Sequence, residues 1–172
     1  VDDCQYFDQL IKRNDLLKHT MEKHNPDFAF PLDADEFVSC NSGENPRKII
    51  SKFNKDKLYK YKMKNFVITG KEPEEELFIP KKLDMMRINE ESVTHGYKCI
   101  VSNKLYKKGI SLIMGAHSAK YINRDEEIPT IISEKIYLAH YPVRSKYQLI
   151  NKIITGRLNN SSLHAREEGL GF

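Results

Sequence analysis

The feature that most constrains the fold is a short apolar run that ends in acidic residues. It begins at Phe28 and leads into the sequence DADEF at residues 33–37. A run of this length is typical of a buried strand, and open α/β sheets bind ligands beyond the carboxyl ends of such strands. Because side chains alternate along a strand, Asp33 and Asp35 are expected to point to one face. Two carboxylates on one face can hold a divalent cation, which can neutralise a diphosphate.

A second apolar run ends in another side chain that can bind a metal. Residues 136–139 lead to His140, and a proline and a helix start follow. An isolated Asp-x-Asp is more simply explained as a polar strand end or a turn, so His140 is what favours a site. Ser145 and Gln148 predict a capping box, and the N-terminus of the helix that follows could face a phosphate.

Taken together, DADEF and the motif HYPVRS at residues 140–145, with the downstream Lys152 and Gly156, resemble the family 2 type of glycosyltransferase. The branch resembled is the one whose motif ends Asp-x-Asp-Glu-Phe, and the resemblance covers roughly residues 27–156. It implies a GT-A fold and metal-dependent transfer of a sugar from a nucleotide sugar to a hydroxyl group. It also implies a glycan, lipopolysaccharide or capsule acceptor, including lipid-linked ones, and inversion at the anomeric carbon.

The resemblance also implies roles for single residues. Asp35 and His140 are expected to bind the metal, and Asp33 to contact the ribose or the metal. Arg144 and Lys152 are expected to contact the diphosphate of the donor. The ion would be Mn²⁺ or Mg²⁺, and a carboxylate combined with an imidazole suits Mn²⁺ somewhat better.

Two further residues are weaker candidates. His117 is a secondary metal candidate, because the resembled family often has a histidine at about this place; a structural histidine at a strand end explains it equally well. Inversion needs a base, for which Glu36 is the weak candidate. Alternation along a strand would turn Glu36 away from Asp35, so the catalytic base is not assigned.

The expected fold is α/β, a mixed sheet with flanking helices. Apolar residues at helical spacing predict a helix over residues 6–21, ended by Asn25-Pro26. Alternating tyrosine and lysine predict a solvated edge strand at residues 59–64. Residues 97–101 and 110–114 are expected to form a hairpin or two neighbouring strands.

The segment before Asp33 is shorter than the nucleotide-binding half of the resembled family, in which each βαβ unit takes about 30 residues or more. Residues 1–172 are therefore interpreted as one domain, a partial transferase catalytic domain that lacks most of that N-terminal half.

Composition narrows the function classes. With 40% hydrophobic and 30% charged residues, the chain is typical of a soluble globular protein. It contains no signal-peptide pattern and no apolar run of about 20 residues, and its three cysteines show no Cys-x-x-Cys spacing. A cytoplasmic location is expected. The net charge of +4 fits a phosphorylated substrate or peripheral contact with the anionic inner face of a membrane, and nucleic acid is not an expected partner.

Two alternatives stay open. A phosphatase of the haloacid dehalogenase type also ends an apolar strand in Asp-x-Asp, with the first aspartate as nucleophile. Thr or Val typically follows that pair, whereas Glu36 and Phe37 follow it here. The other alternative is a non-catalytic binding module, or an inert fragment, whose acids and lysines only make contacts.

Overall fold

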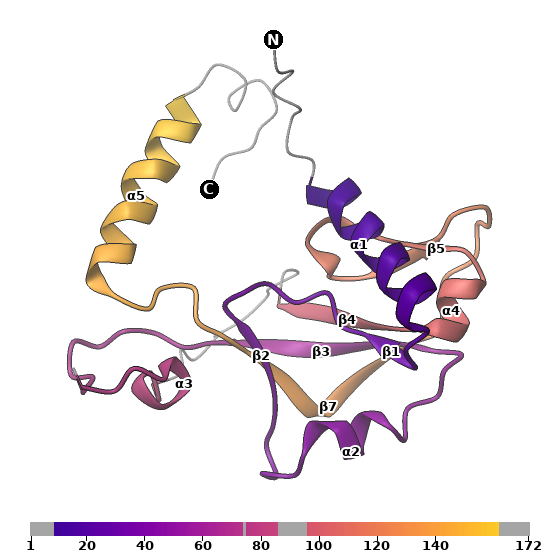
Figure 1. Cartoon of the computed structure of the whole chain (residues 1–172), viewed down its shortest axis with the longest axis horizontal. Coiled ribbons are helices and arrows are strands. Elements are labelled where there is room, and N and C mark those ends of the chain that lie inside the picture. The colour runs from indigo at the N-terminus through magenta and orange to yellow at the C-terminus, as the bar shows by residue number, and fades with distance from the viewer. Residues whose placement is uncertain (1–8, 74, 86–95, 162–172) are drawn as a thin grey trace. The chain divides into compact units, whose positions relative to one another are not determined.

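The protein is an α/β structure with a curled, mixed sheet and flanking helices, in agreement with the expected fold class (Figure 1). The computed structural model describes residues 9–73, 75–85 and 96–161, with side chains of the last helix as far as Thr155. The chain divides into two compact units. The first comprises residues 1–64 and 89–140, and the second comprises residues 65–88 and 141–172.

The main sheet has five strands in the order β1-β4-β3-β7-β2. Their bounds are Phe28–Ala29 for β1, Tyr97–Ser102 for β4, Leu58–Asn65 for β3, Thr130–His140 for β7 and Glu36–Cys40 for β2. The pairs β1–β4, β3–β4 and β2–β7 are antiparallel. A two-stranded antiparallel sheet is formed by β5 (Ile110–Leu112) and β6 (Ala119–Tyr121).

The strands β3 and β7 run in the same direction, which makes the sheet mixed. At the start of β3, the N–H of Leu58 donates to the carbonyl of Pro129, just before β7, at 2.9 Å. Near the end of β3, the ammonium of Lys64 lies 3.9 Å from the ring centroid of Tyr137, towards the end of β7. The two strands therefore run parallel from a common start, and β7 continues past Tyr137 to His140.

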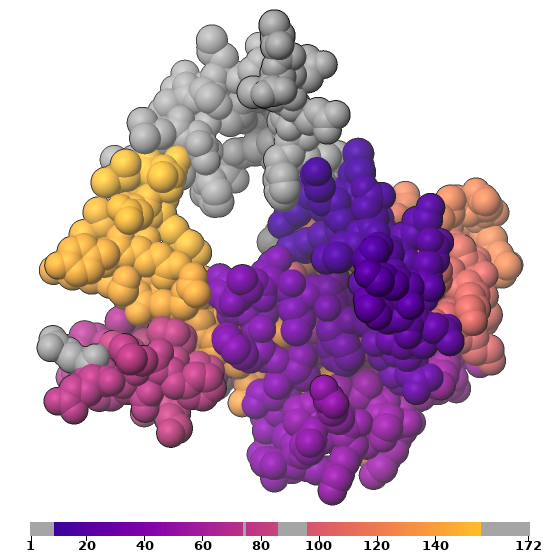
Figure 2. Space-filling view, viewed as in Figure 1, coloured from indigo at the N-terminus to yellow at the C-terminus, as the bar shows by residue number. Residues whose placement is uncertain are grey.

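Helices cover both faces of this sheet. In the first unit, α1 (Gln9–His24), α4 (Asn103–Lys107) and the 3-10 helix η1 (Met114–Ala116) accompany the small sheet, while α2 (Pro46–Ile50) packs against β2 and β7. In the space-filling view the side chains of α1 lie directly beside those of the segment that follows it (Figure 2). The described helices of the second unit are α3 (Ile79–Lys82) and α5 (Lys146–Ser161).

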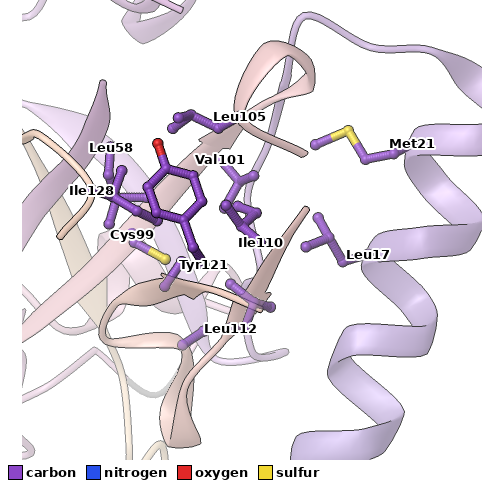
Figure 3. Packing of buried hydrophobic residues seen from close by; sticks show 12 residues of the cluster. Leu17, Met21, Leu58, Cys99, Val101, Leu105, Ile110, Leu112, Tyr121 and Ile128 are labelled. Atoms are coloured by element: carbon purple, nitrogen blue, oxygen red, sulfur yellow. The ribbon is translucent and has the colours of Figure 1, made fainter. Parts of the chain in front are cut away.

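Strand β4 contributes to two hydrophobic clusters, because its side chains alternate between the faces of the sheet. Cys99 and Val101 join the cluster that packs against Leu17 and Met21 of α1 (Figure 3). Ile100 joins the other cluster. Each fully buried aliphatic side chain stabilises the fold by roughly 1.5–3 kcal/mol relative to exposure. A strand that is buried on both faces explains the nearly continuous apolar run of β4.

The second cluster lies between the sheet and α2. Ile49 and Ile50 of α2 meet the buried tyrosines of β3 and the inward side chains of β7. The helix is held at its start by Asn45, whose side chain accepts a hydrogen bond from the N–H of Arg47. Proline at the first helical position needs no hydrogen-bond partner there.

The helix predicted over residues 6–21 is α1, which the structure describes from Gln9; residues 6–8 lie outside the described part. Its predicted end is confirmed. Asn25 adopts a left-handed φ of 45°, its N–H donates to the carbonyl of Met21 at 3.1 Å, and Pro26 follows. Asparagine tolerates this conformation, and proline cannot continue the helix.

The predicted strand leading into DADEF is wrong in its length. Strand β1 contains only Phe28 and Ala29, and the chain turns at residues 33–35 before β2 begins. Pro31 has no N–H for a strand ladder, and the carbonyl of Asp33 accepts a hydrogen bond from the N–H of Glu36 at 3.1 Å. The two aspartates therefore sit in a turn, and strand alternation does not govern their directions.

Two other strand predictions are also wrong. The predicted edge strand at residues 59–64 is β3, which lies between β4 and β7. The expected hairpin of residues 97–101 and 110–114 is interrupted by α4, and β5 pairs with β6 instead. The hydroxyl of Ser102 starts α4 by accepting a hydrogen bond from the N–H of Leu105 at 3.0 Å.

In the second unit, Ser145 caps α5 as the sequence predicts. Its hydroxyl accepts a hydrogen bond from the N–H of Gln148 at 3.1 Å, and the Gln148 side chain accepts one from the N–H of Arg144 at 2.7 Å. Tyr141 is buried and stacks on Phe66 with ring centroids 4.9 Å apart. Among the described residues, no helix has both the length and the apolar character needed to cross a membrane.

Candidate functional site

The candidate site lies where the turn before β2 meets the end of β7. Glu36, the first residue of β2, pairs with His140, the last residue of β7. Asp35 immediately precedes that pair, so the antiparallel ladder brings its carboxylate close to the imidazole. Oδ2 of Asp35 is 3.7 Å from Nε2 of His140, and the two side chains are 20% and 22% exposed. The two residues therefore meet, as their positions beside apolar runs predict.

This pair fits a divalent cation. Metal bonds to aspartate oxygen and histidine nitrogen are about 2.0–2.2 Å long, so one ion can bond two atoms as far apart as about 4 Å. The observed 3.7 Å between Asp35 and His140 is within that span. No third His, Cys, Asp or Glu joins them among the residues that the structure describes. Nucleotide-dependent enzymes commonly bind Mg²⁺ with one or two protein ligands, and water and phosphate oxygens complete the shell.

Asp33 is not brought together with this pair; it binds two cations instead. One carboxylate oxygen is paired with the guanidinium of Arg13, and the other lies 2.9 Å from Nζ of Lys98. Partial burial alone would raise the pKa of Asp33, but the hydrogen bonds and charges of Lys98 and Arg13 outweigh it and lower that pKa. Asp33 is therefore an ionised anchor of the turn.

Glu36 also contacts Lys98, and unlike Asp33 it is buried. One oxygen of its carboxylate accepts a hydrogen bond from the N–H of Asp33 at 2.8 Å, and the other is 3.2 Å from Nζ of Lys98. The side chain of Glu36 is 2% exposed and that of Lys98 is 3% exposed. A carboxylate held in this way does not meet an acceptor hydroxyl, so the geometry gives no support to Glu36 as the catalytic base.

Sequence reasoning missed Arg13 and Lys98. The sequence does contain a signal for Lys98. This lysine stands within the apolar strand β4, directly before Cys99, and a charged side chain in such a strand needs a partner of opposite charge. Arg13 lies four positions before the buried Leu17 of α1 and so shares its face. With Asp33 and Glu36 they form the charge cluster, two cations and two anions whose charges balance.

His117, the secondary metal candidate, is held elsewhere in the first unit. Its Nδ1 is 2.5 Å from the carbonyl oxygen of Tyr97, so this nitrogen carries the proton and donates. The ring also lies so close to Gly115 that a methyl group there would overlap it. Among the described residues His117 forms no group of three with Asp35 and His140. These contacts favour the structural explanation.

The predicted diphosphate contacts, Arg144 and Lys152, belong to the second unit. Arg144 is exposed just before α5, and Nζ of Lys152 donates back to the carbonyl of Pro142, which precedes that helix by four residues. Both cations therefore lie near a helix N-terminus, where backbone N–H groups attract anions. Their contact with a diphosphate stays a prediction.

Comparison of the chain with models of known protein families finds no family that matches, and comparison with curated proteins finds no match.

Proposed function

We propose that this chain carries the metal-binding part of a glycosyltransferase that resembles family 2, which transfers a sugar from a nucleotide sugar to a hydroxyl group of a glycan or a lipid-linked acceptor. The observation that carries the proposal is the meeting of Asp35 and His140 at 3.7 Å, two residues that come from separate motifs of the resemblance. The resemblance supplies the reaction, and the geometry supplies a pair that suits Mn²⁺ or Mg²⁺.

The bound ion would stabilise the negative charge that develops on the departing nucleoside diphosphate. Asp35 and His140 would hold it. The charge cluster fixes the turn beside them, because the carboxylate of Asp33 is tied to Arg13 and Lys98 and its N–H is tied to Glu36. Such support orients a metal-binding side chain before the ion binds and so increases the affinity for the metal.

The resemblance implies contacts of Arg144 and Lys152 with the diphosphate of the donor, and they stay part of the proposal, since a guanidinium and an ammonium both bind phosphate oxygens well. An acceptor hydroxyl must lose its proton in an inverting transfer, and that base is not assigned to any residue.

The phosphatase alternative is disfavoured by the contacts of Asp33. In that chemistry the first aspartate attacks phosphorus, so its carboxylate must be free to reach the substrate. Here both oxygens of Asp33 are paired with cations, Arg13 and Lys98. The metal pair of the transferase proposal, Asp35 and His140, does not include Asp33.

The test compares two variants of the full-length protein, Asp35→Asn and His140→Gln, with the control Asp15→Asn, which changes an exposed carboxylate of α1. Calorimetry measures Mn²⁺ binding with a nucleoside diphosphate present, and a transfer assay uses a panel of nucleotide sugars. We expect each site variant to lose Mn²⁺ affinity by more than about tenfold, the scale seen when support of a metal site is removed. Stability should change by no more than about 0.5 kcal/mol.

Chelation of divalent cations should abolish transfer, and added Mn²⁺ should restore it. Transfer and Mn²⁺ binding that stay normal in both site variants would remove Asp35 and His140 from the site. Normal Mn²⁺ binding without turnover of any nucleotide sugar would leave a metal-binding module and contradict the transferase proposal.

A further inference from the structure

The first unit contains an open cleft at the other end of β7 from His140. It lies between α2, with the segment after it, and residues 131–135 of β7, and its volume is about 470 Å³. This size is within the range of about 300–1,000 Å³ that is typical of ligand sites. The cleft begins five residues before His140, and a strand rises about 3.3 Å per residue, so roughly 16 Å or more of strand separates the two places.

An aromatic ring, held in place by its neighbours, lines the cleft. Phe53 stacks on Tyr59 with ring centroids 3.8 Å apart and planes inclined by 8°. Its edge also meets Phe28 at nearly a right angle. Tyr59 is fixed in turn, because its hydroxyl accepts a hydrogen bond from the N–H of Asn54 at 2.9 Å. The ring of Phe53 is only partly buried, so it offers a rigid apolar surface to a ligand.

Charges at the rim of the cleft balance. Four of its lining residues are exposed and charged, two acids and two bases, namely Glu44, Glu134, Lys52 and Lys135. A site for a phosphate or a metal ion would gather charges of one sign. Carboxylates and ammonium groups together instead supply both acceptors and donors, which suits a neutral ligand that is rich in hydroxyl groups.

Strand β7 adds backbone groups to this set. The ladder between β2 and β7 runs from Glu36–His140 to Cys40–Ile136, so β2 leaves residues 130–135 of β7 uncovered. The side chain of Asn41 donates to the carbonyl of Glu134 at 3.3 Å. Other N–H and carbonyl groups on an uncovered strand edge can bond to a ligand.

We propose that this cleft binds a neutral oligosaccharide. A pyranose ring has an apolar C–H face, which would pack on Phe53, and hydroxyl groups around its edge, which would bond to the charged rim and to the edge of β7. The site would act independently of the metal pair. If the proposed transferase function is correct, the cleft would hold a distant part of a glycan acceptor, but oligosaccharide binding does not depend on that function.

The experiment measures binding of neutral tetrasaccharides of glucose and of N-acetylglucosamine to the full-length protein, by saturation-transfer NMR and calorimetry. A chelator is present and no nucleotide sugar is added. The variant Glu134→Ala/Lys135→Ala changes two exposed rim residues and should fold normally. It is expected to weaken binding by about tenfold or more, the effect of one or two lost hydrogen bonds.

A second variant, Phe53→Leu, removes the ring but keeps an apolar side chain, and it should weaken binding and so reduce the saturation-transfer signals of the sugar C–H protons. The matched control is Lys48→Ala/Glu126→Ala, an exposed base and an exposed acid that do not line the cleft. Asp35→Asn is included because it disables the proposed metal site. Both should bind the tetrasaccharides as the unmodified protein does.

Several results would overturn the proposal. One is the absence of tetrasaccharide binding at millimolar concentration. Another is binding that survives both cleft variants, which would place the sugar elsewhere. A third is capture of an extended peptide along residues 130–135 without sugar binding, which would identify the cleft as a site for strand addition. Absence of transfer by the unmodified protein with Mn²⁺ present, together with intact sugar binding, would contradict the proposed function alone.

Discussion

Asn14 of α1 pairs with both backbone groups of Leu112 in β5. Its side-chain oxygen accepts a hydrogen bond from the N–H of Leu112 at 2.8 Å, and its amide donates to the Leu112 carbonyl at 3.3 Å. A neighbouring strand would make the same two bonds. The side chain of Asn14 therefore replaces a strand partner at the edge of the small sheet and joins α1 to it.

The first prediction concerns this join. Asn14→Ala removes the partner of the Leu112 N–H, while the Leu112 carbonyl keeps a hydrogen bond from the hydroxyl of Ser111 at 3.2 Å, and Leu112 is only 1% exposed. The free energy of unfolding should fall by about 1–3 kcal/mol, the usual cost of unsatisfied buried polar groups. Urea denaturation measures it. The control Lys18→Ala, an exposed position of the same helix, should change stability by less than about 0.5 kcal/mol. Equal stability of the two variants would contradict the assigned role.

The second prediction concerns Gly115, which holds a left-handed φ of 70° beneath the ring of His117. Gly109 has a similar φ of 79°, but within the described part of the chain no atom lies within 4 Å of a methyl group added there. Gly109→Ala should therefore cost about 1–2 kcal/mol from backbone strain alone. Gly115→Ala should cost more, because the ring must also move. Denaturation gives the difference, and the NMR signals of the His117 imidazole should shift in Gly115→Ala only.

Local signals account for what the sequence could predict. The end of α1 follows from Asn25-Pro26, and the start of α5 follows from Ser145 and Gln148, because these residues satisfy backbone groups within one turn of themselves. The meeting of Asp35 and His140 was predicted from two motifs, each beside an apolar run. The two residues meet because β2 pairs antiparallel with β7. The expectation that both follow the ends of strands is correct for His140 only, since Asp35 precedes β2.

What could not be predicted depends on partners distant in the sequence. Alternating tyrosine and lysine in β3 are compatible with an edge or an interior strand, since long lysine side chains can reach water from either. The position of Asp33 follows from Arg13 and Lys98, which lie in α1 and β4, and no local pattern joins these three residues. Ser102 starts α4 because its hydroxyl bonds to Leu105, although the flanking apolar runs favour a hairpin.

The third prediction concerns pH and Asp56. Hydrogen bonds from Lys104 and Lys108 lower the pKa of Asp56 below its usual value. A group whose pKa is lowered by folding stabilises the fold at pH values above its unfolded pKa of about 4, and that contribution is lost as the pH falls through the folded pKa. Asp56→Asn should therefore lower the urea midpoint at pH 7 and have little effect at about pH 2.

The control for this prediction is Asp125→Asn, an exposed acid in a polar turn of the first unit. It should change the midpoint little at either pH. Because Asp56 is at the surface, added salt should also reduce the effect of Asp56→Asn at pH 7. An effect that is as large in acid as at pH 7 would show that the substitution acts through packing, and the ion pairs would then contribute nothing measurable.

The last prediction concerns Lys98 in the charge cluster. Lys98→Met keeps the length of the side chain but leaves the carboxylates of Asp33 and Glu36 without this cation. Asp33 is 43% exposed and still has Arg13, whereas the side chain of Glu36 is 2% exposed. The buried charge of Glu36 should therefore dominate the loss of stability, which is expected to be about 3–5 kcal/mol, as for other broken buried pairs.

Two double variants separate these contributions. Adding Glu36→Gln to Lys98→Met removes the buried charge and should restore most of the lost stability, while adding Asp33→Asn should restore much less. Urea denaturation of the three variants and of each single change gives the coupling energies. Mn²⁺ affinity should also fall in Lys98→Met, although neither Asp35 nor His140 is altered, because the turn that holds Asp35 loses an anchor. Equal rescue by the two double variants would mean that Glu36 is no more deeply buried in solution than Asp33, and unchanged Mn²⁺ affinity would separate the charge cluster from the metal site.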